Sequence, residues 1–253
     1  MLSQGSESLP NGFVSKLEVP HLELSPQQEL VALAQALFDI GYSDNMAGHI
    51  TIYQDDGTLL CNPWGPQWDQ VTASEVIRID LQGNLIEGSY PVPPGIPLHL
   101  ALHAARKDIR VAVHNHAHWS GLWAAAHEIP PVLDQTGGLT GVEVALVNEF
   151  EGPVNDMSLA EAAIGRMGSA EIALLANHGV FVLGDSVAKV YLRCYAFEWR
   201  CRRAIEVKGV GAGVPLKPEV LSALSTRVDS HGFPGYWDAA VRSVVLKRPS
   251  LLF

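Results

Sequence analysis

Two short apolar segments that end in histidines constrain the fold of this chain more than any other feature. The first is Val111-Ala112-Val113-His114-Asn115-His116, and the second is the run 172–176 followed by Asn177-His178-Gly179. Side chains two positions apart on an extended segment point to the same face, so His114 and His116 can approach one ion. Because both segments have the composition of core strands, His178 is expected to lie at the same sheet edge. Gly179 would let the backbone pass close by.

Each of these histidines taken alone is more simply explained as an ordinary core or surface residue, because a His-x-His pair is a weak signal. The three together change that balance. A catalytic divalent metal usually takes three protein ligands and keeps one position open for substrate. The sequence therefore predicts a metal site formed by His114, His116 and His178.

Composition excludes several classes of protein. Of the 253 residues, 47% are hydrophobic and 17% charged, which is typical of one large globular domain. The formal net charge is -10 and no basic stripe is present, so nucleic acid is not expected as a partner. Without a leader-like start or a long apolar run, the chain is expected to have no membrane association. Cys61, Cys194 and Cys201 are odd in number and widely spaced, which predicts reduced thiols in a cytoplasmic protein.

The pattern of apolar residues and turn formers predicts three parts: an irregular arm over 1–24, a main domain over 25–208 and a C-terminal extension over 209–253 that packs on the domain or on a neighbouring subunit. Ser25 is expected to cap a helix that ends near Ile40, with Gln28 closing a capping box. Further helices are predicted over 98–106, 158–167, 186–207 and 238–246, the second of them opened by a capping box of Ser158 and Glu161. Strands are predicted over 49–53, 58–61, 76–79, 111–116, 172–176 and 180–183.

Strands mixed with helices and hairpins indicate a layered α/β domain with a mixed, largely antiparallel sheet. The glycine clusters Gly137-Gly138 and 209–213 do not stand between a strand and a helix as G-x-G-x-x-G, and no P-loop is present. No nucleotide cofactor is therefore predicted.

Several motifs in sequence order resemble the class II aldolase/adducin family over roughly residues 30–204. Gly48-His49-Ile50-Thr51 is similar to an early Gly-Asn-Ile-Ser turn of that family, and Asn62-Pro63-Trp64-Gly65 is similar to its Thr-Pro-Ser-Gly loop. Leu98-His99, the His-x-His pair and Asn177-His178-Gly179 follow in the family's order. The resemblance implies an α/β/α fold and one divalent metal per subunit on His114, His116 and His178. Zinc is the usual ion, and Mn, Co or Fe would also accept imidazole ligands.

The chain departs from the family's sugar-phosphate aldolases at the proton-transfer group. Their glutamate lies in a Ser-Ser-Glu segment four residues before the Leu-His histidine, and this chain has Pro93-Pro94-Gly95 there. Gly95 cannot act as a general base. Phosphate-binding hydroxyls are also replaced, one of them by Trp64, and His49 stands where the family has Asn. These changes favour an unphosphorylated and flatter substrate, such as an aromatic ring, with Asn62, Trp64 and Gly95 as substrate-binding residues.

With these substitutions, the motifs resemble those of a branch of the family that contains metal-dependent decarboxylases. These enzymes act on ortho-hydroxylated aromatic or pyridine dicarboxylates, and dihydroxyphthalate decarboxylase serves as a model. Such an enzyme needs a proton donor, for which His49 and His118 are the candidates, the latter because it extends the alternation of His114 and His116. The alternative is an aldolase or epimerase acting on an unphosphorylated hydroxy-carbonyl compound.

A third alternative comes from another class of protein, because adducin-like members keep the fold as interaction modules without catalysis. Such members tend to lose the metal histidines, and all three are present here. The resemblance further implies a homo-oligomer, usually a tetramer, with the active site near a subunit interface.

Overall fold

The computed structural model describes residues 22–148, 156–231 and 235–252 of the chain. Most of the predicted arm over 1–24 lies outside these residues. The strands are β1 (His49–Tyr53), β2 (Leu59–Cys61), β3 (Ile77–Ile79), β4 (Leu85–Glu87), β5 (Val111–Asn115), β6 (Val144–Val147), β7 (Ile172–Leu175) and β8 (Gly179–Gly184). The helices are α1 (Pro26–Asp39), α2 (Pro97–Ala105), α3 (His118–Ala126), α4 (Gln135–Gly138), α5 (Met157–Met167), α6 (Val187–Val207), α7 (Pro218–His231), α8 (Tyr236–Lys247) and α9 (Pro249–Leu252), with a 3-10 turn, η1 (Ala73–Glu75).

The eight strands form one sheet in the order β4-β3-β2-β1-β5-β8-β7-β6. Within the described residues, β6 and β7 pair in parallel and every other pair of neighbours is antiparallel. The predicted mixed, largely antiparallel sheet is therefore confirmed. The strands β5 and β8, which flank the predicted histidine motifs, are neighbours at the centre of the sheet.

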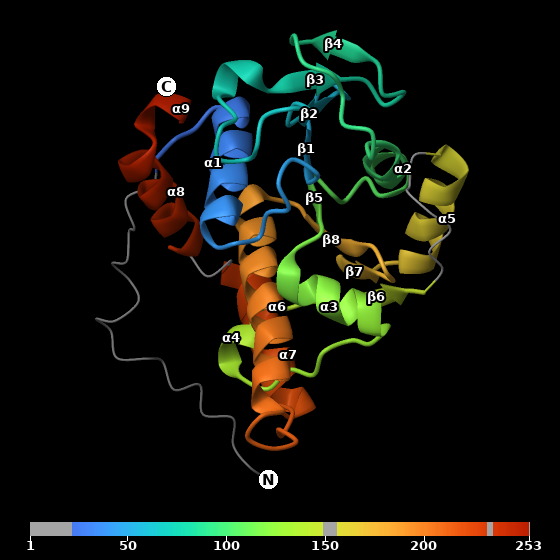
Figure 1. Cartoon of the computed structure of the whole chain (residues 1–253), viewed down its shortest axis with the longest axis vertical. Coiled ribbons are helices and arrows are strands. Elements are labelled where there is room, and N and C mark those ends of the chain that lie inside the picture. Colours follow the sequence, from blue (N-terminus) through green and yellow to red (C-terminus); the bar gives the residue numbers. More distant parts are fainter. Residues whose placement is uncertain (1–21, 149–155, 232–234, 253) are drawn as a thin grey trace.

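Helices cover both faces of this sheet, as the α/β/α prediction requires. In Figure 1, α1, α6 and α8 lie on one side of the strands, and α2 and α5 lie on the other. The first side holds the larger apolar core, in which alternate strand residues such as Ile50, Val113 and Val182 pack against helix residues such as Leu33 and Phe197. The second side holds a smaller core in which Ala112, Phe181 and their neighbours meet α2 and α5.

Local signals explain most helix starts. Ser25 and Gln28 form the predicted capping box of α1, with each side chain bonded to the other residue's backbone N–H (3.3 and 2.8 Å). Ser186 caps α6 as its predicted boundary requires. The capping box predicted for Ser158 is wrong, because Asp156 is the N-cap of α5 and its carboxylate accepts from the backbone N–H of Ser158 (2.7 Å). Aspartate accepts two residues ahead as readily as serine, so the N-cap of α5 lies two residues earlier than predicted.

The C-terminal residues form three helices, of which sequence patterning predicted part of α8. Trp237 and Val244 of α8 join the larger core with α1 and α6, and Lys247 pairs with Asp39 of α1 (2.8 Å). Trp237 packs against Tyr191 of the same chain (5.8 Å between ring centroids). The three cysteines are buried free thiols, as predicted. A search of the described residues finds no helix with the length and apolar character that crossing a bilayer requires.

Candidate metal centre

The register of three strands brings the histidine motifs to one edge of the sheet. His114, near the end of β5, lies opposite His49 of β1 and opposite Phe181 of β8. His178 directly precedes β8, in a turn where Asn177 adopts a left-handed conformation (φ 56°), one that asparagine tolerates better than most residues. A side chain on Gly179 would meet the backbone oxygen of Asn115 at 2.5 Å. The chain can therefore pass His116 closely only because position 179 is glycine.

His114, His116 and His178 form a compact triangle. Their ring centroids are 5.2 Å apart for His114 and His116, 4.7 Å for His114 and His178, and 5.0 Å for His116 and His178. One nitrogen from each ring lies within 4.8 Å of the other two. Three imidazole nitrogens at such separations can bind one divalent ion and leave a coordination position open.

Hydrogen bonds at the far side of two rings support this fit. The Nδ1–H of His114 donates to the backbone oxygen of Val180 (3.1 Å), which can only accept, and His116 Nδ1 donates to the carboxylate of Asp44 (2.8 Å). These bonds leave the Nε2 lone pair of each ring available for a metal, as in many histidine metal sites. His116 Nε2 is buried and has no hydrogen-bond partner in the described part of the chain. The donor set therefore fits a divalent cation.

Burial keeps the imidazoles of His114 and His178 neutral. Burial holds the pKa of His114 well below its usual value, and neighbouring histidines lower it further. Burial, followed by the charge of His116, lowers the pKa of His178 to about 4. A neutral imidazole has a free lone pair at neutral pH, which is the state that binds a metal.

His49 lies beside this triangle, and Gly95 provides the space for its ring. The His49 ring centroid is 5.6 Å from that of His114, and the side chain is 5% exposed. A Cβ atom on Gly95, which lies just before α2, would stand 2.1 Å from Cε1 and 2.8 Å from Nδ1 of His49. The imidazole therefore fills the space that a side chain at position 95 would need. The two predicted site residues depend on each other, although 46 positions separate them.

A buried polar network supports His49 from α2. The Thr51 hydroxyl, two positions along β1, bonds both His99 Nδ1 (2.8 Å) and His103 Nε2 (2.9 Å). The His99 ring meets His49 edge-on with 5.9 Å between centroids. Burial also lowers the pKa of His49 and of His103 to about 4. His49 is therefore neutral at neutral pH.

The predicted substrate-binding residues Asn62 and Trp64 have different surroundings. Asn62 is 1% exposed, and its amide bonds the backbone of Ile50, Gly48 and Pro63. It therefore holds the turn before β1 in place, and its predicted contact with a substrate stays a prediction. Trp64 is half-buried, and its backbone N–H donates to Pro91 O (3.0 Å) in the loop that leads to Gly95.

His118 does not continue the strand alternation, because β5 ends at Asn115 and His118 begins α3. It is exposed, and its ring packs on that of its neighbour Trp119 (4.8 Å between centroids). A residue that the sequence did not single out, Asp44, instead contacts the cluster through His116. No local pattern marks Asp44, since it lies in a turn 72 residues before its partner.

Comparison with known proteins identifies the family. Residues 28–205 match the family described as Class II Aldolase and Adducin N-terminal domain. This chain belongs to that family. Among curated relatives of this class II aldolase-type protein, 3,4-dihydroxyphthalate decarboxylase from Arthrobacter keyseri is 28% identical over 76% of this chain and 83% of the relative. A 5-deoxy-D-ribulose 1-phosphate aldolase from Bacillus thuringiensis is 22% identical over 81% of this chain and 96% of the relative.

Solved structures agree on the fold. An aldolase II superfamily protein from Pseudomonas syringae superposes with a TM-score of 0.80 over 91% of this chain and 98% of that chain, at 23% identity. The two relatives named above are an aldolase and a decarboxylase, and both are carbon–carbon lyases. Family membership therefore supports an enzyme of the carbon–carbon lyase class.

Proposed function

We propose that this protein is a metal-dependent decarboxylase of an ortho-hydroxylated aromatic or heteroaromatic carboxylate, such as a dihydroxyphthalate. The observation that carries the proposal is the glycine at position 95. The imidazole of His49 occupies the space that a side chain there would need, beside three clustered histidines. The three clustered ligand-type side chains are all histidines, and the neighbouring carboxylate of Asp44 is bonded to His116 Nδ1. Similarity to a dihydroxyphthalate decarboxylase over most of both chains supports the same reaction.

In this proposal His114, His116 and His178 hold one divalent cation, with zinc favoured and Mn, Co or Fe as alternatives. When bound, the cation would supply positive charge that stabilises the anion left on the substrate after the C–C bond breaks. Asp44 and the Val180 carbonyl fix the orientation of two of the three ligand rings. The buried faces of His114 and Phe181 exclude water from one side of the site.

His49 is proposed as the group that moves the proton. Its Nδ1 is buried and lacks a hydrogen-bond partner within the described residues. The neutral ring can take the proton of a substrate hydroxyl and return it to the ring carbon that loses carbon dioxide. The electron pair of the broken C–C bond then becomes the new C–H bond, and His49 ends neutral, so no oxidant or reductant is needed. His118 is a weaker candidate because it is exposed on α3.

The remaining site assignments concern the substrate and the assembly. Trp64 is proposed to contact a flat ring, since its loop is tied to the segment that leads to Gly95. Gly95 is proposed to contact the substrate through its backbone, because the His49 ring fills the space that a side chain at position 95 would need. We also propose a homo-tetramer with the site near a subunit interface, an arrangement implied by the family resemblance.

The test is a carbon dioxide assay with metal-loaded protein and a panel of aromatic acids that carry a hydroxyl next to a carboxylate, headed by 3,4-dihydroxyphthalate. We expect stoichiometric release of carbon dioxide and the corresponding phenol, and loss of both in His178→Ala. Release of an aldehyde without carbon dioxide from unphosphorylated hydroxy-carbonyl compounds would instead select the aldolase alternative. Absence of turnover across the panel in a metal-loaded sample would contradict the decarboxylase proposal.

A further inference from the structure

A second concave site lies on the other side of the sheet from the histidines. It is a cavity of about 350 Å³ between the loop that joins α4 to β6, helix α6 and helix α7. The histidine cluster faces α2, whereas Arg200 in this cavity comes from α6, which packs on the opposite face. The cavity shares none of its lining residues with the candidate metal centre.

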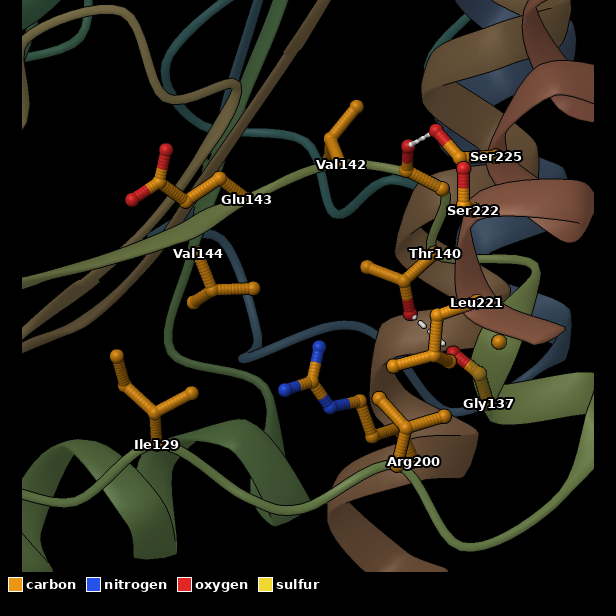
Figure 2. A pocket seen from close by; sticks show the side chains of 13 residues that line it. Ile129, Gly137, Thr140, Val142, Glu143, Val144, Arg200, Leu221, Ser222 and Ser225 are labelled. Atoms are coloured by element: carbon orange, nitrogen blue, oxygen red, sulfur yellow. Dashed lines mark hydrogen bonds between the residues drawn. The ribbon is translucent and has the colours of Figure 1, made fainter. Parts of the chain in front are cut away.

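Arg200 is the central polar group of the cavity. Figure 2 shows its guanidinium directed into the open space, between Ile129 to the left and Thr140 and Leu221 to the right. Its Nε and Nη2 donate to the backbone oxygen of Pro130 (2.9 and 2.6 Å), and Nη1 has no hydrogen bond within the described residues. Burial lowers the pKa of Arg200 to about 10. The guanidinium is therefore a poorly hydrated charge held in a fixed position.

The neighbouring arginines of α6 differ from Arg200 in their partners. Arg202 pairs with Glu206 (2.7 Å) and Arg203 pairs with Asp134 (3.1 Å). Within the described residues, no carboxylate lies within ion-pair distance of Arg200. A partly buried charge without a counter-charge is costly, and an anion that enters the cavity would remove that cost through charge-assisted hydrogen bonds.

The walls of the cavity limit the kind of anion that fits. Ile129, Val142, Val144 and Leu221 give it an apolar lining. Glu143 lies at the rim, and Figure 2 shows its carboxylate pointing away from Arg200. A second negative charge on the ligand would be repelled by Glu143 and by the net charge of -10. An apolar body with a single carboxylate satisfies both the lining and the guanidinium.

We propose that this cavity is a binding site for a small organic monoanion, with its carboxylate on Arg200 and its apolar body against Ile129, Val144 and Leu221. The site is separate from the metal centre and does not depend on the reaction catalysed there. The Gly137-Gly138 turn gives it shape, because a Cβ on Gly137 would stand 3.2 Å from Cβ of Arg200 and one on Gly138 would stand 2.5 Å from Leu224.

The test is calorimetric titration of the metal-free full chain with benzoate, and with benzylamine as a cation of the same shape. We expect benzoate to bind one site per chain and benzylamine not to bind. Arg200→Gln should weaken benzoate binding by roughly tenfold or more, as expected for loss of a charged hydrogen-bonding partner. Arg202→Gln, on the same helix but outside the cavity, is the matched control and should leave benzoate affinity unchanged.

A second pair of variants guards against a folding defect in Arg200→Gln, because Arg200 also holds Pro130. Leu221→Trp should fill the cavity and abolish benzoate binding while both Arg200 hydrogen bonds remain. Val220→Trp adds the same side chain at the neighbouring exposed position of α7 and should bind benzoate like the wild type. Equal affinity in both tryptophan variants would overturn the proposal.

Two further outcomes distinguish binding in this cavity from binding at the metal centre and from occupation of the cavity by a second copy of the chain. His114→Ala should retain benzoate binding, and loss of binding there with retention in Arg200→Gln would place the probe at the metal centre and overturn the proposal. Wild-type protein that fails to bind benzoate, together with a change of oligomeric state in Arg200→Gln, would show that a carboxylate of a second copy occupies the cavity. These titrations do not measure turnover, so their results can be interpreted even if the decarboxylase assay fails.

Discussion

Strands β1 and β5 have the same length and lie side by side. The two faces of this strand pair carry different kinds of side chain. One face carries aliphatic side chains such as Ile50 and Val113, all fully buried against α1 and α6. The other carries His49, Thr51 and His114 toward α2. Alternation along the strands therefore assigns stability to one face and chemistry to the other. Variants of adjacent residues should separate the two functions.

Loss of a metal ligand should give the largest effect on activity. His114→Ala removes one of three imidazoles, and we expect carbon–carbon lyase activity to fall by roughly a thousandfold or more because a bound metal supplies several kcal/mol of charge stabilisation. Turnover is measured with saturating metal, and circular dichroism checks the fold. Activity within tenfold of the wild type, at equal metal occupancy, would contradict a ligand role.

The adjacent aliphatic face should respond in the opposite way. Ile50→Ala opens a cavity in the larger core, and we expect unfolding free energy to fall by about 2–5 kcal/mol. The folded fraction should keep its metal content, because Ile50 points away from the histidines. Denaturant titration measures the first quantity and metal analysis the second. A variant of normal stability that lost its metal would break the division between the faces.

Gly95 tests the contact between a loop and the histidine face. Gly95→Ala places a Cβ 2.1 Å from the His49 ring, so the ring must move, and we expect turnover to fall by roughly ten- to a hundredfold with metal content retained. Gly165→Ala in α5 is the matched control, since no atom lies within 4 Å of its added Cβ. That control should be fully active. Equal activity in the two variants would argue against His49.

Asp44 tests the support of a ligand ring. Asp44→Asn weakens the bond to His116 Nδ1, and we expect metal affinity to fall by roughly ten- to a hundredfold, the usual cost of losing such a carboxylate. Asp55→Asn, at an exposed turn position, is the control and should leave affinity unchanged. Affinity is measured by competition with a chelator. An unchanged affinity in Asp44→Asn would show that this hydrogen bond does not affect the metal.

The smallest effect is a pH dependence of stability. Burial lowers the pKa of His103 to about 4 in the folded chain, against about 6.5 when unfolded. Between these values the unfolded chain takes up a proton that the folded chain does not, so stability is full above pH 6.5 and falls as the pH drops. We expect His103→Gln to flatten the loss of stability of metal-free protein between pH 7 and pH 5. An equally steep loss in the variant would contradict the assignment.

Local signals predicted the fold well where they were strong. The capping box at Ser25 and the apolar alternation of 49–53 fixed α1 and β1 within a residue or two. Weak signals failed elsewhere. The exposed strand β4 has three residues and no buried face, so it lacks the alternation that marks a strand. The helix α3 was missed because His118 continued an apparent strand pattern.

The metal ligands could be predicted because two of them share a strand face and the third follows a core strand. The contacts that tune them could not, because they join residues far apart in the sequence. Asp44 reaches His116 from another turn, and His49 meets Gly95 only through the pairing of β1 with β5 and the entry to α2. The burial that neutralises His49 is likewise a property of tertiary packing, which composition does not reveal.

Metal content is the most direct test of the division between the two faces. Wild type, His178→Ala and Ile50→Ala should be loaded with zinc, freed of excess ion and analysed for metal per folded chain. We predict one equivalent in wild type and Ile50→Ala and no retained metal in His178→Ala. One equivalent retained in His178→Ala, or no metal bound by the wild type, would contradict the claim that these histidines form a metal centre.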